Sequence, residues 1–167
     1  WGITYGLPVI VTNCSNNYGP FHFPEKLIPR IIINALLEEK LPIYGDGKQI
    51  RDWLYVDDHV RALSKIIING KINETYNISG NNNISNISLV KKICYLMDKK
   101  LKIDGSSTSE LISFVKDRKG HDVRYALDSN KIRNELNWKP IESIETGLEK
   151  TIDWYLENQD WSKEVAK

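Results

Sequence analysis

The feature that most constrains the fold is a short apolar run that leads directly into a long polar segment. Val9-Ile10-Val11 is short and β-branched, which predicts a buried strand. Residues 12–29 follow, and they combine amides, a thiol, a hydroxyl and an imidazole with Gly19 and three prolines. In open α/β sheets, ligands bind beyond the carboxyl ends of the strands. This segment therefore predicts a loop that forms a rigid polar pocket.

Strands and helices alternate along the rest of the chain, which predicts an α/β fold. Hydrophobic periodicity and end signals predict helices at about 25–39, 57–69, 87–99, 128–137 and 143–157, and strands at about 8–12, 41–44, 49–56, 74–78 and 111–115. Pro29 is compatible with the first helix only within its first turn, where no amide donor is needed. The segment around Gly105 predicts a flexible connection.

The strands are too few for a complete doubly wound sheet, and no Gly-x-Gly-x-x-Gly sequence occurs. We therefore expect the C-terminal part of a Rossmann-like doubly wound sheet, built from strands at about 8–13, 50–56 and 74–78. A smaller mixed α/β substrate-binding domain is expected to be interleaved with it, over about 14–49 and 79–167. Because the chain begins at Trp1, we expect it to be the C-terminal part of a larger protein.

Charge and cysteine content exclude several classes of protein. Lys and Arg number 23 against 22 Asp and Glu, giving a net charge of +1, whereas a nucleic-acid platform would show a basic excess. No apolar run reaches membrane-spanning length, and no signal peptide is evident. Cys14 and Cys94 lie far apart without metal-type spacing. We expect reduced thiols, a cytoplasmic location and neither nucleic-acid nor membrane partners.

Two successive amides, Asn16 and Asn17, follow the first predicted strand. A carboxamide both donates and accepts hydrogen bonds, so it can bind an amide, a hydroxyl or a phosphate. Successive side chains after a strand can also point to different ligands. The sequence Asn-Asn-Tyr-Gly-Pro is equally typical of a turn, and the two interpretations remain open here.

Two arginines are candidates for binding an anion. The guanidinium of Arg51 is suited to clamp a diphosphate, although a surface pair with Asp52 is the alternative. Arg118 and His121 lie in a charged loop that is a second possible anion site.

Pro42 and Tyr44 flank Ile43 at strand spacing, which predicts that both side chains face one side. A tyrosine ring and a proline face can sandwich a nucleobase, with core packing as the alternative. His22 and His59 have no partner at metal-ligand spacing, so no metal site is expected.

Several blocks of the sequence, taken in order, are similar to one family. They are Tyr5-Gly6-Leu7-Pro8, residues 12–29, Leu41-Pro42-Ile43-Tyr44-Gly45, residues 49–59, residues 74–78, residues 117–122 and Asn137-Trp138-Lys139-Pro140. Together they resemble the C-terminal half of the dTDP-glucose 4,6-dehydratases, which are extended short-chain dehydrogenase/reductases. The sequence departs from the usual pattern at Lys119, where Pro is common, and at Asn137, where Gly is common. Asn tolerates the left-handed conformation that follows a helix.

The resemblance implies an NAD-dependent lyase that converts dTDP-glucose to dTDP-4-keto-6-deoxyglucose. C4 is oxidised by tightly bound NAD, water leaves across C5 and C6, and the hydride returns to C6. It implies a homodimeric intact enzyme whose catalytic groups precede Trp1, so that this chain alone carries none of them and is inactive. The alternatives are another NAD-dependent nucleotide-sugar epimerase or decarboxylase, and a non-catalytic nucleotide-sugar-binding module.

The resemblance also implies residue roles. Cys14 and Asn17 would line the nicotinamide end of NAD. The residues expected to bind the dTDP-sugar are Asn16 for the sugar, Lys26 and Leu27 near the nucleotide or its phosphates, Pro42, Ile43 and Tyr44 for the thymine, Arg51 and Arg118 for the diphosphate, and Asn86 and His121 in support.

Overall fold

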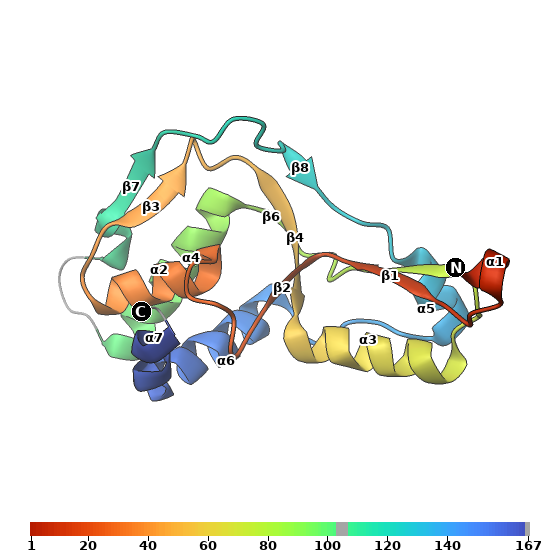
Figure 1. Cartoon of the computed structure of the whole chain (residues 1–167). Helices are drawn as coiled ribbons and strands as arrows, with labels where there is room; N and C mark the ends of the chain where they lie inside the picture. The colour runs from red at the N-terminus through yellow and green to blue at the C-terminus, as the bar shows by residue number, and fades with distance from the viewer. Residues whose placement is uncertain (103–106, 166–167) are drawn as a thin grey trace.

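The predicted alternation of strands and helices is confirmed by a computed structural model of the protein, which describes residues 1–102 and 107–165 (Figure 1). The helices are α1 (Gly2–Tyr5), α2 (Leu27–Leu36), α3 (Val56–Asn69), α4 (Asn86–Leu101), α5 (Asn130–Leu136), α6 (Ile144–Glu157) and α7 (Gln159–Val165), with a 3-10 helix η1 (Thr108–Leu111). The strands are β1 (Val11–Cys14), β2 (Asn16–Tyr18), β3 (Leu41–Tyr44), β4 (Ile50–Tyr55), β5 (Thr75–Ile78), β6 (Asn83–Ser85), β7 (Ile112–Val115) and β8 (Arg124–Tyr125). The connection expected to be flexible around Gly105 lies largely outside the described residues.

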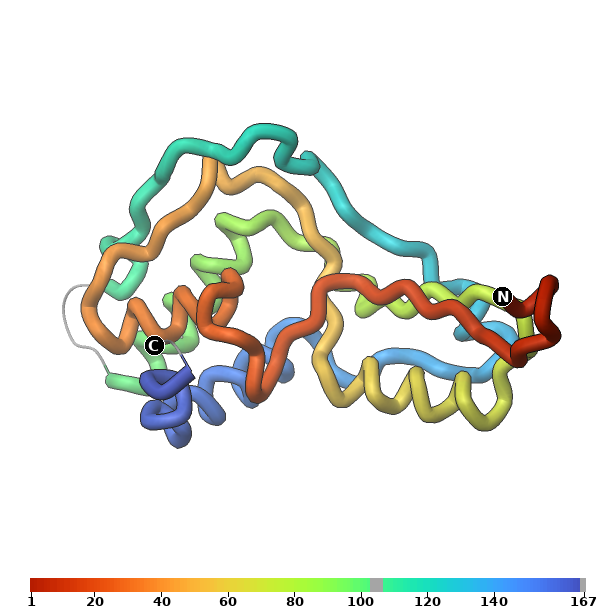
Figure 2. The backbone as a smooth tube through the Cα atoms, viewed as in Figure 1, coloured from red at the N-terminus to blue at the C-terminus, as the bar shows by residue number. Residues whose placement is uncertain are grey.

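The first two strands form one extended run that passes from one sheet to the next. Strand β1 pairs in parallel with β5, and β2 pairs in parallel with β4. Only Ser15 separates β1 from β2, and its amide donates to the Ile78 carbonyl at 3.0 Å. Figure 2 shows this run crossing the middle of the molecule. It therefore links the part that contains β5 with the part that contains β4.

The strand pairing differs from the expected grouping of strands 8–13, 50–56 and 74–78. Strand β4 pairs with β2, β6 and β8, whereas β1 pairs only with β5 among the described strands. Strand β3 pairs in parallel with β7. The division into a Rossmann part and a substrate-binding part stays a prediction, because strand pairing alone does not define domains.

The prediction that residues 12–29 form only a loop after the first strand was wrong. Strand β1 extends through Cys14, and residues 16–18 form β2, with Asn16 opposite Trp53 and Tyr18 opposite Tyr55. Asparagine is depleted in strands, so local propensity favoured a turn here. Main-chain pairing with a strand more than thirty residues away overrides that preference.

The five predicted helices are confirmed, with ends that differ from the prediction by up to three residues. Pro29 lies in the first turn of α2, and α3 ends at Asn69 before Gly70. Helix α3 begins at Val56, one residue before the predicted start, and Asp57 lies in its first turn. There its negative charge still interacts favourably with the helix dipole. No helix within the described ranges is long and apolar enough to cross a membrane.

The end of α5 confirms the expectation for Asn137, which adopts the left-handed conformation with φ 46°. Lys65 reaches this end from α3, and its ammonium donates to the carbonyls of Leu136 at 3.2 Å and Asn137 at 2.9 Å. These bonds satisfy carbonyl groups that the helix leaves without partners.

Two hydrophobic cores lie on either side of β4. Trp53 and Tyr55 belong to the larger core, which contains Tyr18 and the apolar faces of α2, α4 and α6. Leu54 belongs to the smaller core, with residues of α3 and β5 such as Tyr76. Successive side chains of a strand point to opposite sides, so this one strand contributes to both cores.

We predict that Gly147→Ala destabilises the protein by overpacking. A Cβ atom at Gly147 in α6 would lie 2.1 Å from the hydroxyl oxygen of Tyr18, a fully buried side chain. Overpacking costs about 1–3 kcal/mol, which exceeds the gain of about 1 kcal/mol from replacing a helical glycine. Chemical denaturation measures the effect. The exposed Glu149→Ala in the same helix is the control, expected within about 0.5 kcal/mol of wild type. Equal stabilities of the two variants would contradict the prediction.

Candidate functional site

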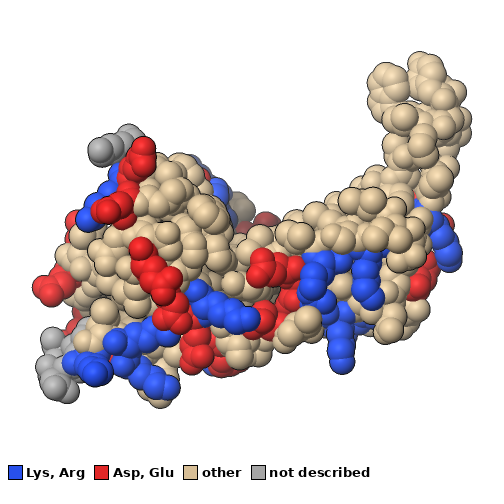
Figure 3. Space-filling view, turned by 90° about the horizontal axis from the view of Figure 1, so that it is seen from below, with Lys and Arg blue, Asp and Glu red and all other residues tan. Residues whose placement is uncertain are grey.

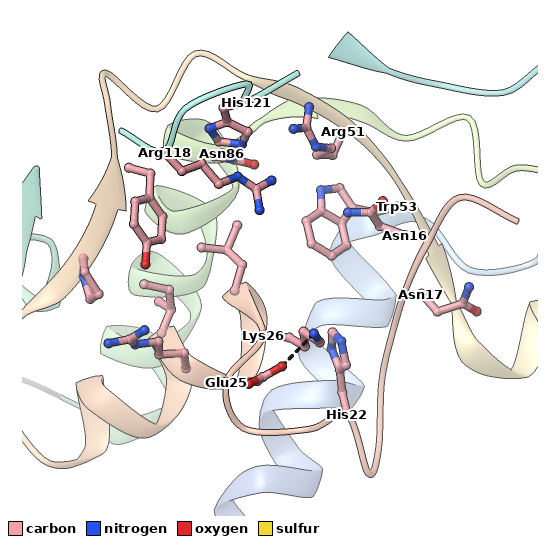
Figure 4. Close-up of a pocket in the computed structure, with 15 residues that line it drawn as sticks. Asn16, Asn17, His22, Glu25, Lys26, Arg51, Trp53, Asn86, Arg118 and His121 are labelled. Carbon is pink, nitrogen blue, oxygen red and sulfur yellow. Dashed lines mark hydrogen bonds and ion pairs between the residues drawn. The ribbon is translucent and has the colours of Figure 1, made fainter. Parts of the chain in front are cut away.

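The pocket expected beyond the first strand is present as a cavity of about 520 Å³, a size typical of small-ligand sites. Its walls come from β2, the segment that leads into α2, β3, β4, the start of α4 and the loop before β8. The lining residues are Asn16, Asn17, His22, Glu25, Lys26, Leu27, Arg30, Ile31, Pro42, Tyr44, Arg51, Trp53, Asn86, Arg118 and His121. Figure 4 shows how the labelled side chains lie around this space, with Asn17 pointing away from the others.

All predicted site residues line this cavity except Cys14 and Ile43. Ile43 is 1% exposed and packs in the larger core, on the opposite face of β3 from Pro42 and Tyr44. Tyr44 is 46% exposed, so the alternative that it packs in the core is wrong. The predicted alternation along this strand is confirmed, and it excludes the Ile43 side chain from the cavity wall.

Asn16 and Asn17 point to opposite sides of β2 (Figure 4). The Asn17 amide nitrogen donates to the Ser15 carbonyl at 3.0 Å and to the Cys14 sulfur at 3.4 Å. Its amide oxygen is buried without a hydrogen-bond partner among the described residues. Cys14 does not line the cavity, but it contacts Asn17, which does. The amide oxygen of Asn17 is an acceptor that remains available to a ligand.

Arg51 is a buried cation without a carboxylate partner among the described residues. It is 8% exposed, and its guanidinium donates to the carbonyls of Ile50 at 2.8 Å and Asp122 at 2.9 Å. The alternative pair with Asp52 is not formed, because Asp52 accepts from the Ser79 hydroxyl at 2.5 Å on the other side of β4. A buried guanidinium held only by carbonyl groups favours binding of an anion.

The loop that carries Arg118 is held in place by Asp117. One carboxylate oxygen of Asp117 lies 2.7 Å from His121 Nδ1 and also accepts from the Arg118 amide at 2.8 Å. The other accepts from the Gln49 side chain at 2.8 Å. The hydrogen bond from His121 is the largest of the contacts that lower the pKa of Asp117 below its ordinary value. The Arg118 guanidinium itself forms no ion pair within the described ranges.

Asn86 is the first residue of α4, where the positive end of the helix dipole favours an anion. The first three amides of the helix are already bonded, to the carbonyls of Gln49 and Gly47 and to the hydroxyl of Ser85. Its side-chain oxygen is buried without a partner among residues 1–102 and 107–165. Figure 4 shows Asn86 beside Arg118 and His121, with Arg51 on the same side of the cavity. These four groups form one polar wall.

His22, Glu25 and Lys26 lie on the opposite side of the cavity (Figure 4). Lys26 and Glu25 form an ion pair at 2.8 Å. Burial, and then the positive charge of Lys26, lower the pKa of His22 below its ordinary value. Its Nδ1 atom has no hydrogen-bond partner in the described part of the chain. His22 therefore presents a neutral imidazole to a ligand at neutral pH.

Sequence reasoning missed five lining residues, namely His22, Glu25, Arg30, Ile31 and Trp53. Arg30 lies one helical turn after Lys26, and Trp53 lies two residues after Arg51 in a strand. Helix and strand periodicities place such residues on the same face, so these two could have been predicted from the spacing.

The cavity carries an excess of positive charge. Lys26 is paired with Glu25, whereas the guanidiniums of Arg30, Arg51 and Arg118 have no carboxylate within ion-pair distance among the described residues. Elsewhere the two signs are interspersed, as on the face seen from below in Figure 3. In residues 1–102 and 107–165, no group of three or more His, Cys, Asp or Glu side chains is placed to hold a metal ion. The cavity is therefore suited to an organic anion.

An α/β fold with a cationic cavity, and with a proline and an exposed tyrosine on the cavity wall, is typical of the class of proteins suited to a phosphorylated ligand with a planar ring. The chain belongs to the family described as GDP-mannose 4,6 dehydratase, whose model matches residues 1–151.

Relatives within the family confirm the resemblance inferred from the sequence. The dTDP-glucose 4,6-dehydratase of Neisseria meningitidis serogroup B is 56% identical over an alignment 168 residues long. The alignment covers 99% of this chain and 47% of that protein. The structure of dTDP-glucose 4,6-dehydratase from Bacillus anthracis in complex with NAD matches with a TM-score of 0.89 and 46% identity, over 98% of this chain and 50% of that chain.

A third match is DesIV, a dTDP-glucose 4,6-dehydratase from Streptomyces venezuelae with NAD and TYD bound. Its TM-score is 0.88 at 40% identity, over 98% of this chain and 48% of that chain. The chain thus spans about half the length of the relatives it matches.

We predict that the stability supplied by Asp117 disappears in acid. Its pKa is lower in the folded protein than in the unfolded chain, where it is about 3.9. The stabilisation is therefore fully present above the unfolded-state pKa and is lost as the pH falls through the folded-state pKa. The melting temperature of wild type should exceed that of Asp117→Asn at about pH 7, and the difference should shrink towards about pH 3. Glu149→Gln is the control. A difference that does not change with pH would contradict the assignment.

Proposed function

We propose that this chain supplies the sugar-nucleotide-binding half of a dTDP-glucose 4,6-dehydratase. The intact enzyme would convert dTDP-glucose to dTDP-4-keto-6-deoxyglucose, and the resemblance favours a homodimer. The observation that carries the proposal is the convergence of two unpaired guanidiniums, Arg51 and Arg118, with Pro42 and Tyr44 in one cavity. A nucleoside diphosphate has a matching diphosphate and a planar base.

The diphosphate would lie against the polar wall. Arg51 is held by two carbonyl groups and is already oriented, so little side-chain freedom is lost when it binds an anion. The Asp117 bonds orient His121 and the main chain of Arg118 in the same way. Asn86 lies at the positive end of the α4 dipole, which favours an anion. These contacts favour a ligand with two negative charges.

The thymine would lie beside Pro42 and Tyr44, whose side chains share one face of β3. The sugar would then extend towards Asn16 and His22, away from the diphosphate. Lys26, which the resemblance places near the nucleotide or its phosphates, lies on the same side of the cavity as His22 and is assigned to the sugar in this proposal. Amide, imidazole and ammonium groups can all bond to sugar hydroxyls. Lys26 and Leu27 open α2 at the same end of the cavity.

Asn17 and Cys14 fit the nicotinamide end of NAD, the cofactor named for the Bacillus anthracis and Streptomyces venezuelae structures. The buried, unpaired oxygen of Asn17 can accept a hydrogen bond from the cofactor's carboxamide. Cys14 is a free thiol that the Asn17 amide orients. When bound, NAD would accept a hydride from C4 of the glucose and return it to C6. The residues of this chain bind and orient the reactants.

We further propose that the acid–base groups of the reaction lie outside this chain, as the resemblance implies. The support is that relatives are about twice as long as the chain. A second candidate is a GDP-mannose 4,6-dehydratase, because the matching family model carries that description. The two candidates differ in the base that must fit beside Pro42 and Tyr44.

Turnover by the full-length protein distinguishes these functions. We expect loss of one water from dTDP-glucose, measured by mass spectrometry, and little reaction with UDP-glucose or GDP-mannose. UDP-glucose keeps both the glucose and the diphosphate, so it is the control for the nucleoside. GDP-mannose differs in the nucleoside and in the sugar, so it tests the second candidate. Preference for GDP-mannose would support the second candidate. Binding of dTDP-glucose without turnover by NAD-loaded protein would instead indicate a non-catalytic module.

We predict that Arg51→Ala in the full-length protein weakens binding of thymidine diphosphate by about 1.5–3 kcal/mol, the range for hydrogen bonds to charged groups. Titration calorimetry measures the change. Arg124→Ala is the matched control, because Arg124 is an exposed arginine of β8 that does not line the cavity. An unchanged affinity in Arg51→Ala would exclude the diphosphate clamp.

A further inference from the structure

Phe21 has an unusual backbone conformation immediately beside the cavity. Its φ is 59°, in the left-handed region. A bulky aromatic residue rarely adopts this conformation, and it persists only where the surrounding structure determines it. Such residues concentrate at functional sites, so the contacts that hold Phe21 are informative.

The Phe21 side chain is 67% exposed, and its ring packs on one side against the last two helices of the described chain. Its centroid lies 4.6 Å from that of Trp154 in α6 and 5.5 Å from that of Trp161 in α7, the latter at an interplanar angle of 89°. Trp154 and Trp161 contact each other with centroids 5.1 Å apart. Edge-to-face pairs at these distances are favourable beyond their burial of area.

Tyr155 fixes the main chain of His22, the residue that follows Phe21. Its side chain is 1% exposed, and its hydroxyl donates to the main-chain carbonyl of His22. Burial raises the pKa of Tyr155 above its ordinary value, so the hydroxyl stays protonated and remains a donor. We call Phe21, Trp154, Tyr155 and Trp161 the aromatic clamp.

The aromatic clamp and the cavity lie on opposite sides of the segment that contains Phe21 and His22. The ring of Phe21 contacts α6 and α7, whereas the imidazole of His22 lines the cavity. The segment continues to Lys26, whose amide donates to the Phe23 carbonyl at 3.0 Å. Glu25 and Lys26 are the charged groups that share this side of the cavity with His22 (Figure 4). A shift at residues 21–22 would therefore move all three polar groups.

We propose that the aromatic clamp is a positioning device that sets His22 and Lys26 against the sugar of the bound nucleotide sugar. This inference rests on the proposed function. The clamp itself touches no ligand. The polar wall, which includes Arg51, Arg118 and Asn86, belongs to other elements, so it keeps its geometry when the aromatic clamp is weakened. The clamp therefore affects reaction of the sugar and leaves nucleotide binding unchanged.

Kinetics of clamp variants of the full-length protein test this separation. In Tyr155→Phe and Trp161→Ala we expect kcat to fall about tenfold or more, because small displacements of positioning groups are costly. The Kd of thymidine diphosphate should stay within about twofold of wild type. Trp161→Phe and Phe21→Tyr keep the aromatic contacts and should retain most of the activity. A parallel loss of kcat and thymidine diphosphate affinity would overturn the proposal.

A matched control separates positioning from stability. Tyr76 is also fully buried and its hydroxyl also forms hydrogen bonds, but it lies in the smaller core away from the cavity. Tyr76→Phe should lower the melting temperature as much as Tyr155→Phe does, while kcat per folded molecule stays unchanged. Equal kcat values for Tyr155→Phe and Tyr76→Phe would show that the clamp is merely structural.

A second readout does not depend on turnover. The His22 imidazole can be followed by NMR, with its signals assigned from His22→Gln. In Trp161→Ala and Tyr155→Phe the pKa of His22 should rise towards its ordinary value, because the ring becomes less buried while Glu25 and Lys26 are kept. An unchanged pKa of His22 in these variants would overturn the proposal that the aromatic clamp positions His22. Wild-type protein that leaves dTDP-glucose unreacted would overturn the proposed function, and this readout would still decide whether the clamp positions His22.

Discussion

Strand β4 is the constraint on which both cores and the cavity depend, because its side chains are buried on both faces. Arg51 and Trp53 line the cavity, whereas Asp52 and Leu54 face the other side, where Asp52 bonds to Ser79. A slip of one residue in strand register would exchange the two sets. It would bring a carboxylate into the cavity and leave a guanidinium without its carbonyl partners. The register of β4 therefore determines the charge of the site.

Neutral carbonyl groups hold the Arg51 guanidinium, and no carboxylate among the described residues pairs with the Arg118 guanidinium. Arg51 is bonded to two carbonyls, and Asp117, the carboxylate closest in sequence to Arg118, is occupied by His121 and Gln49. A carboxylate partner would have neutralised these guanidiniums and reduced their attraction for an anion. Fixing them through carbonyls and through the main chain preserves the positive charge and also gives the orientation that diphosphate binding requires.

The segment between β1 and α2 contributes to three parts of the structure, because residues close in sequence point in different directions. Asn17 lies at the proposed cofactor end, His22 lines the cavity opposite the polar wall, and Phe21 packs against helices near the end of the described chain. Its two ends are anchored by β2 pairing and by the first turn of α2. The middle depends on Tyr155, which is 133 residues away in the sequence from His22. The segment is therefore a tertiary feature despite its short length.

The sequence by itself determined the helices, the alternation along β3, the left-handed Asn137 and most lining residues, because these follow from local periodicity, backbone preference and family resemblance. Only the tertiary structure decided that residues 16–18 form a strand, that Arg51 and Asp52 do not form an ion pair, and that His22 lines the cavity. The reason is physical: strand pairing, burial of charge and cavity walls depend on contacts between residues far apart in the chain, which local patterns do not encode.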